Sequence, residues 1–332
     1  MILRYIIGLI VGLAALVWSA DFFVDNAAKF ARRCGLSQLL VGMLVVGFGT
    51  SLPELSVSFL SALRGNPSIA LGNAYGSNIA NILLILGVTA AICPIAVAET
   101  VRRRDLPVLC VATIAAWLLL LNKAISRMDA IAMLAVFLGI CIWNTLRDKA
   151  APEKMKTSGD KRQAASDKSG ASLAALCGKI VAGGALVVGS SMLLVSSATG
   201  LARALGVSDL IIGLTVVAIG TSLPELASSL AAISKREHDI AIGNIIGSNL
   251  FNMLAVVGVA GVTRPIVGAE NTEVMRTVLL RDYPVMAGVT LLLFLFCARW
   301  GKERAMIGRA KGIIFLVLYV GYIAMLAKET LA

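Results

Sequence analysis

Histidine, aromatic and charged side chains are scarce in this chain of 332 residues. Aromatic residues make up 6% of it and charged residues 15%, and His238 is the one histidine. The sequence shows no Ser/His or paired-aspartate arrangement of the kind that hydrolases use, which argues against an enzyme. The low aromatic content also argues against a site that stacks an organic substrate on aromatic rings.

The six cysteines lack a functional spacing. None forms a CxxC motif or a pattern typical of metal ligands. Most fall within or near apolar segments, where a cysteine behaves as a small packing residue. The sequence therefore predicts neither a disulfide framework nor a thiolate metal site. The six are Cys34, Cys93, Cys110, Cys141, Cys177 and Cys297.

Apolar residues, by contrast, dominate the chain. They account for 58% of it, the mean hydropathy is +0.88, and 31 residues are glycine, which lets membrane helices approach closely. A soluble domain does not need so much apolar sequence, so we expect an all-α polytopic membrane protein. The apolar runs predict ten transmembrane helices, at residues 3–22, 38–62, 69–92, 106–122, 129–146, 173–200, 209–233, 240–262, 284–298 and 312–328.

Basic residues lie between the apolar runs and give the chain a net charge of +11. This placement argues against nucleic-acid binding and indicates membrane topology instead. If the N-terminus lies outside, the inner loops hold 21 of the 30 lysines and arginines and the outer loops hold 9. The positive-inside rule therefore predicts that both termini lie outside. The first apolar segment lacks a convincing cleavage site, and we expect it to be retained as a span.

A polar segment divides the chain into two halves. Residues 148–172 are rich in Lys, Ser, Ala and Asp, a composition typical of a flexible linker. We expect this loop to be cytoplasmic. It would connect a first repeat at residues 1–147, with helices one to five, to a second repeat at residues 173–332, with helices six to ten.

The two halves share one sequence pattern. The heptapeptide Gly-Thr-Ser-Leu-Pro-Glu-Leu occurs at residues 49–55 and again at 220–226, within stretches that align without gaps. Self-similarity of this kind predicts two copies of one structural unit. Five predicted spans separate the copies, and this odd number makes the second copy cross the membrane in the opposite sense. The sequence thus predicts two inverted-topology five-helix repeats.

Each copy places one glutamate beside a proline within an apolar span, Glu54 in the first and Glu225 in the second. An ionisable group at that depth is costly and by default indicates function. The proline cannot donate a hydrogen bond to the carbonyl group of the glycine four residues earlier, so we predict broken helices 2 and 7. The residues that break them are Gly49 and Pro53 in helix 2, and Gly220 and Pro224 in helix 7.

The neighbouring polar side chains are all hard oxygen donors. Thr50 and Ser51 can share the face of the glutamate, and the next span carries a stripe of Asn73, Ser77 and Asn81. The second copy repeats both groups. Carboxylate, hydroxyl and amide oxygens suit Ca²⁺ and Na⁺, and nothing in this set suits a soft metal.

At these motifs the chain resembles the cation/calcium exchanger superfamily, in particular the bacterial and archaeal calcium/sodium antiporters related to the K⁺-dependent Na⁺/Ca²⁺ exchangers. The resemblance implies Na⁺/Ca²⁺ antiport by alternating access across a bacterial-type inner membrane, with no cofactor. It also implies a site formed by spans 2, 3, 7 and 8, with backbone carbonyl groups near Gly47 and Ala218. The side chains that it assigns to the cation are Thr50, Ser51, Glu54, Ser77 and Asn81, with Thr221, Ser222, Glu225, Ser248 and Asn252.

Some exchangers of this superfamily carry an aspartate where this chain has Asn81 or Asn252. Only two carboxylates then face the ions, which leaves K⁺ dependence and the ion ratio undecided. A cation/H⁺ antiporter and a passive cation channel are alternatives that could use the same carboxylates. The expected partners are membrane lipid and small inorganic cations. By family analogy a monomer suffices for transport and spans 1 and 6 move, while the oligomeric state and the transport direction stay open.

Overall fold

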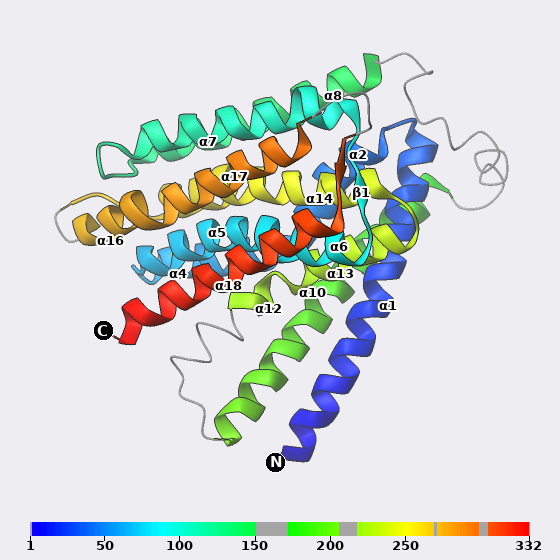
Figure 1. Cartoon of the computed structure of the whole chain (residues 1–332), viewed down its shortest axis with the longest axis horizontal. Helices are drawn as coiled ribbons and strands as arrows, with labels where there is room; N and C mark the ends of the chain where they lie inside the picture. Colours follow the sequence, from blue (N-terminus) through cyan, green and yellow to red (C-terminus); the bar gives the residue numbers. More distant parts are fainter. Residues whose placement is uncertain (1, 151–171, 206–217, 269–270, 299–304, 332) are drawn as a thin grey trace. The chain divides into compact units, whose positions relative to one another are not determined.

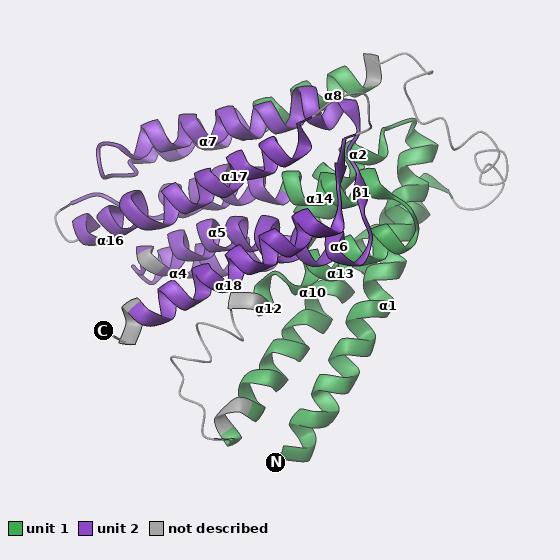
Figure 2. Ribbon diagram, in the orientation of Figure 1, with its two compact units in different colours: residues 1–50, 138–247 green, residues 51–137, 248–332 purple. Residues whose placement is uncertain are grey.

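The computed structural model describes residues 2–150, 172–205, 218–268, 271–298 and 305–331. Most of the predicted linker 148–172 and the first part of the predicted span 209–233 lie outside the described residues. The chain forms two compact units, one of residues 1–50 and 138–247 and the other of residues 51–137 and 248–332 (Figure 2). Each unit draws on both halves of the sequence. The repeat boundaries at 147 and 173 stay a prediction, because compactness does not test them.

The secondary-structure elements of the described part of the first unit are all helices. Two of its helices, α8 and α14, begin or end in the other unit. Its elements are α1 (Ile2–Cys34), α2 (Gln38–Val41), the π-helix η1 (Gly42–Val46), α3 (Gly47–Thr50), the end of α8 (Arg127–Ala150), α10 (Leu173–Ala204), α12 (Ala218–Thr221), α13 (Leu223–Ser234) and the start of α14 (His238–Leu250).

The second unit combines helices with one antiparallel pair of two-residue strands, β1 and β2, which the sequence did not predict. Its elements are α4 (Leu52–Leu63), α5 (Pro67–Ala80), η2 (Asn81–Leu86), α6 (Gly87–Ile92), β1 (Ile95–Ala96), η3 (Val101–Asp105), α7 (Leu106–Leu120), the start of α8, the end of α14, η7 (Phe251–Val256), α15 (Val257–Thr263), α16 (Thr272–Thr277), η9 (Val278–Asp282), α17 (Tyr283–Cys297), β2 (Met306–Ile307) and α18 (Arg309–Leu331).

Seven helices of the described chain are long and apolar enough to cross a membrane. An eighth span follows if Gln38–Thr50 and Leu52–Leu63 are counted as one broken helix. Of the ten predicted spans, 209–233 is described only in part, and 106–122 corresponds to the 15-residue α7. The count of ten therefore stays a prediction.

Two predicted boundaries were wrong because charged residues continue the helices beyond their apolar cores. Helix α1 runs to Cys34 and not to residue 22, since Asp25 and Lys29 pair at 2.7 Å on its last turns. The ninth span begins at Thr272 and not at residue 284. Within it, Arg281 and Asp282 neutralise each other at 2.7 Å. Hydropathy alone does not detect such pairs.

In the first unit, α1 and α10 lie side by side and run antiparallel (Figure 1). Gly12 of α1 approaches the backbone of Leu194, and two turns later the Ser19 hydroxyl is hydrogen-bonded to that of Ser190 at 3.3 Å. Further along α1, Phe23 approaches Gly183. The partner residue number falls as the α1 number rises, which defines the antiparallel direction.

Three glycines let η1 and α14 cross with their backbones in contact. A Cβ atom at Gly42 would lie 2.5 Å from the carbonyl oxygen of Ile240, and one at Gly243 would lie 2.5 Å from that of Leu39. A Cβ atom at Gly247 would overlap the carbonyl oxygen of Met43. Small residues at such crossings replace the hydrophobic effect as the source of close packing in membranes.

Replacing Gly247 by alanine should therefore push the two helices apart. We expect a loss of about 1–3 kcal/mol of stability, the usual cost of overpacking, measured as a lower midpoint of thermal unfolding in detergent. Gly139→Ala is the control, because Gly139 is exposed on α8 and no described atom beyond its own helix lies within 4 Å of its Cβ position. Equal midpoints for the two variants would contradict the close crossing.

Candidate cation site

The second repeated motif interrupts its helix at Ser222. Helix α12 ends at Thr221 and α13 begins at Leu223, with Pro224 in its first turn. Pro224 has no N–H for the carbonyl group of Gly220, and that oxygen instead accepts a hydrogen bond of 3.0 Å from the Ser191 hydroxyl of α10. The carbonyl group released by the proline is thus satisfied from a neighbouring helix.

The first motif has the same local form. Helix α3 ends at Thr50 and α4 begins at Leu52, with Pro53 in its first turn. Gly47 is buried and begins α3. In the second motif Ala218 begins α12. Whether the carbonyl groups of Gly47 and Ala218 bind a cation stays a prediction.

Both glutamates lie in the first turn of a helix and are buried, with Glu54 1% exposed and Glu225 0% exposed. The N-terminus of a helix carries partial positive charge, which favours a carboxylate there. Burial of an ionised carboxylate otherwise costs several kcal/mol, roughly, unless charges or hydrogen bonds compensate it. Two such carboxylates are therefore suited to binding cations.

In the first unit the structure brings one residue of the first motif together with the second motif. The Thr50 hydroxyl lies 3.3 Å from the Oδ1 atom of Asn244, to which it can donate. The Nδ2 atom of Asn244 donates to the carbonyl oxygen of Glu225 at 3.2 Å and to the Ser229 hydroxyl at 3.0 Å. Helix α3 also contacts α13 directly. Thr50, Thr221, Ser222 and Glu225 are the predicted side chains in this unit.

The second unit holds the other predicted side chains, Ser51, Glu54, Ser77, Asn81, Ser248 and Asn252. Helices α4 and α5 pack together here, and η7, which carries Asn252, contacts both of them. Ser77 and Ser248 are buried. The two groups of predicted residues lie in different units.

Hydrogen bonds orient two of the buried amide groups of the second unit, those of Asn78 and Asn81. Asn81 donates through Nδ2 to the Oδ1 atom of Asn249 at 3.2 Å, and Asn78 donates to the carbonyl oxygen of Asn249 at 3.1 Å. This arrangement leaves the buried Oδ1 atom of Asn81 without a hydrogen bond from any described residue. The same holds for both amide atoms of Asn252. Asn81 and Asn252 thus present buried amide oxygens of the kind that hard cations prefer.

Three π-helices in this region were not predicted from the sequence. The π-helices η2 and η7 begin at Asn81 and Phe251, and η1 directly precedes Gly47. Segments of this kind often occur at functional sites, but their hydrogen-bond register is not encoded in hydropathy. Ser58 and Ser229 were also missed, although both belong to the gap-free stretch of the repeat.

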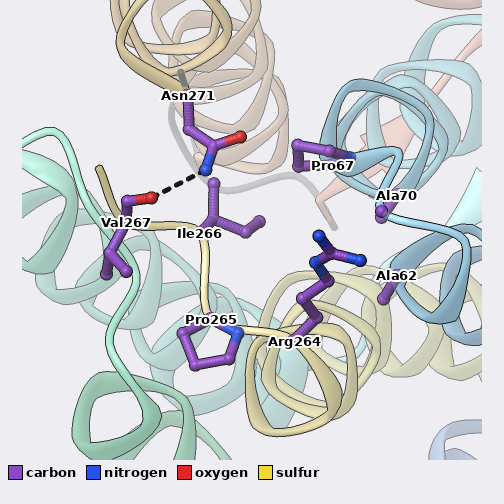
Figure 3. Close-up of a pocket in the computed structure, with 9 residues that line it drawn as sticks. Ala62, Pro67, Ala70, Arg264, Pro265, Ile266, Val267 and Asn271 are labelled. Carbon is purple, nitrogen blue, oxygen red and sulfur yellow. Dashed lines mark hydrogen bonds between the residues drawn. The ribbon is translucent and has the colours of Figure 1, made fainter. Parts of the chain in front are cut away.

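A pocket of about 160 Å³ lies elsewhere in the second unit, between the α4–α5 turn and the loop after α15 (Figure 3). Arg264 lines it, and Asn271 donates to the carbonyl oxygen of Val267 at its rim. None of the predicted cation ligands lines this pocket. An arginine does not bind cations, so this pocket is not the candidate site.

Long apolar helices and buried carboxylates at helix breaks define an integral membrane protein of the transporter class. The family model described as sodium/calcium exchanger protein matches residues 4–146 and 176–328. The chain belongs to this family, whose members are transporters and not enzymes.

Similarity to other proteins extends along nearly the whole chain. A protein described as putative antiporter CaxA from Alkalimonas amylolytica is 41% identical over 94% of this chain and 95% of its own length. The inner membrane protein YrbG of Escherichia coli (strain K12) is 37% identical over 96% of this chain and 95% of its own. A solved structure of the sodium-calcium exchanger NCX_Mj, soaked with Na⁺ and Sr²⁺, is similar with a TM-score of 0.80 and 31% identity, over 98% of this chain and 99% of that one.

Removing the Ser191 hydroxyl should leave the Gly220 carbonyl group without its donor. We expect Ser191→Ala to lower stability by about 0.5–2 kcal/mol, the range for a buried hydrogen bond between membrane helices, measured as a lower unfolding midpoint in detergent. Ser196→Ala, on the exposed side of the same helix, is the matched control. If both variants unfold at one temperature, the carbonyl group does not depend on Ser191.

Proposed function

We propose that this protein is a secondary antiporter that exchanges Na⁺ for Ca²⁺ by alternating access in a bacterial-type inner membrane. The family, the antiporter relative, the exchanger structure and the inner-membrane relative support this proposal. The transported ions are the substrates, and the protein needs no cofactor. Membrane lipid and small inorganic cations are its partners, and a monomer suffices for transport.

The hydrogen bonds of Asn244 carry the proposal. Through this one side chain, the hydroxyl of Thr50 in the first motif is connected to the backbone of Glu225 in the second. Two motifs 171 residues apart are therefore joined by a polar network inside one compact unit. The arrangement supports a role in cation binding for Thr50 and for the second copy of the motif. The ten side chains that the sequence predicts are the proposed ligands.

Two carboxylates set the charge of that site. Glu54 and Glu225 together balance one Ca²⁺ or two Na⁺, so occupancy by one ion excludes the other. An empty site would leave two buried like charges that repel each other, which disfavours a change of access without a cation. Competition for the same carboxylates is the physical basis of exchange.

Several contacts support two inverted five-helix repeats with ten spans. The first helices of the two halves, α1 and α10, run antiparallel, as inversion requires. Ser19 contacts its equivalent Ser190, and Asn78 contacts its equivalent Asn249, as expected of residues on a two-fold axis. The two segments matched by the family model nearly coincide with the predicted repeats. The excess of basic residues in the inner loops supports outside termini.

The contacts of α1 and α10 suit a moving group. The two helices pack along their length, so they would move as one body. Lys235, at the end of α13, pairs with Asp21 of α1 at 2.9 Å, and Arg32 of α1 lies 3.4 Å from Glu237. A shift of α1 against α13 would open these pairs. Asp21 is exposed, and a pair at the surface contributes about 0–1 kcal/mol, so the Lys235–Asp21 pair would oppose the movement only weakly. The Arg32 and Glu237 side chains are mostly buried, so their pair would have to separate together with a change in their exposure.

Neutralising either glutamate should abolish transport. We expect Glu54→Gln or Glu225→Gln to reduce Na⁺-driven ⁴⁵Ca²⁺ uptake into proteoliposomes by about 100-fold or more, because losing one charge opposite a buried partner costs about 3–5 kcal/mol. Glu99→Gln is the control. Glu99 is exposed, and hydrogen bonds from Arg102 and Arg103 lower its pKa. Retained uptake in both glutamine variants would remove these residues from the site.

The driving ion can be identified by imposing gradients one at a time on the reconstituted protein. We expect an outward Na⁺ gradient to drive Ca²⁺ uptake against its own gradient, because the two ions compete for one pair of carboxylates. A pH gradient or a K⁺ gradient alone should drive none. Uptake with a pH gradient in the absence of Na⁺ would establish a cation/H⁺ antiporter, and failure to move Ca²⁺ against its gradient would establish a channel.

A further inference from the structure

Asn73 and Asn244 occupy equivalent places in the two repeats, four residues before Ser77 and Ser248. The sequence groups each with a stripe of possible oxygen ligands. In the structure, however, both side chains direct their amide nitrogen at the helix that carries a glutamate. Their bonding is the same in both units, although the units are formed by different segments.

Each amide makes the same two donations. Asn73 donates through Nδ2 to the carbonyl oxygen of Glu54 and to the Ser58 hydroxyl, both at 2.9 Å. Asn244 donates through Nδ2 to the carbonyl oxygen of Glu225 at 3.2 Å and to the Ser229 hydroxyl at 3.0 Å. An amide nitrogen carries two hydrogens, so both are used. The amide therefore connects its helix to the backbone of the glutamate and to the next turn.

The carbonyl groups that accept from Asn73 and Asn244 lie at the start of helices that follow a break. Helices α4 and α13 each begin two residues before the glutamate, directly after a break, so the preceding helix does not hold their first turn in line. A hydrogen bond to the glutamate's own carbonyl group restrains the backbone from which the carboxylate projects. Cation ligands must keep their distances within a few tenths of an ångström, roughly, so this restraint acts on ion binding.

Asn244 also acts on a hydroxyl group. Its Oδ1 atom is one of the acceptors open to the Thr50 proton, together with the carbonyl oxygens of Val46 at 3.0 Å and Gly47 at 3.4 Å. A hydroxyl has a single proton and two lone pairs. When the proton points at any of these acceptors, the lone pairs of Thr50 are available to a cation.

We propose that Asn73 and Asn244 are positioning residues, which hold Glu54 and Glu225 in place for Ca²⁺ and do not themselves ligate the ion. The inference rests on the proposed function, since it concerns the same site. A positioning residue and a ligand predict opposite changes in Ca²⁺ affinity when the asparagine is replaced by aspartate. An aspartate at either place keeps oxygen atoms and adds negative charge but removes both donors.

The test measures Ca²⁺ affinity for the wild type, Asn73→Asp and Asn244→Asp in the full-length protein. The first measure of affinity is the KM for Na⁺-driven ⁴⁵Ca²⁺ uptake in proteoliposomes. The second, which does not require Na⁺, is the dependence of the unfolding midpoint on the Ca²⁺ concentration. We expect both aspartate variants to weaken Ca²⁺ binding about 10-fold or more, as loss of a partner that orients a metal ligand does. Tighter binding in either variant would identify a ligand and overturn the proposal.

A milder pair of variants covers the case in which aspartate prevents folding. Ser229→Ala removes one acceptor of Asn244, whereas Ser229→Thr keeps a hydroxyl group. We expect the alanine variant to raise the KM for Ca²⁺ with little change in the maximal rate, and the threonine variant to restore it. Equal KM values for wild type, Ser229→Ala and Ser229→Thr would overturn the positioning role.

Asn271→Asp is the matched control, because Asn271 is half-buried at the pocket of Arg264 and its side-chain amide donates to the nearby carbonyl oxygen of Val267, away from both glutamates. Its Ca²⁺ affinity should equal that of the wild type. The proposed exchange and the positioning role can be refuted separately. A wild type that binds Ca²⁺ but shows no Na⁺-driven uptake would refute the proposed exchange and leave the positioning role to be decided by the Ca²⁺-dependent unfolding midpoints.

Discussion

Polar groups placed among apolar membrane helices must find their partners inside the protein, because hydrocarbon offers none. This constraint governs the region around the repeated motifs. The carbonyl group that Pro224 leaves without an intrahelical donor is met by Ser191 of α10. The carbonyl group of each glutamate is met by an asparagine of a neighbouring helix. Hydrogen bonds from neighbouring helices thus satisfy the backbone both at the second helix break and at each glutamate.

The hydrogen bonds around the two glutamates are similar in the two repeats but not identical. Equivalent donations by Asn73 and Asn244 give the two glutamates similar backbone environments. The symmetry is incomplete, however. The residue that corresponds to Ser191 in α1 is Ala20, which has no hydroxyl group to donate. The Gly49 carbonyl group therefore cannot be satisfied by the equivalent side chain of α1 in the way that Ser191 satisfies Gly220.

Much of the fold followed from hydropathy, and its failures have two causes. Eight of the ten predicted spans correspond to long apolar helices or to the broken pair at Ser51. The predicted ends of α1 and the start of the ninth span were wrong, because Asp25 with Lys29 and Arg281 with Asp282 neutralise each other within a helix. The π-helical turns at Asn81 and Phe251 were also missed, since hydropathy carries no information on hydrogen-bond register.

The sequence by itself determined the membrane class, the duplication and the two glutamates beside prolines, because composition, repetition and the missing N–H of proline act locally. It also supplied the oxygen-rich residue types around them. Only the tertiary structure decided which of those oxygens are already engaged. Asn81 and Asn252 present buried amide oxygens, whereas Asn73 and Asn244 use their amide nitrogens to hold the glutamate helices. Identical side chains acquire different roles because their partners come from helices distant in the sequence.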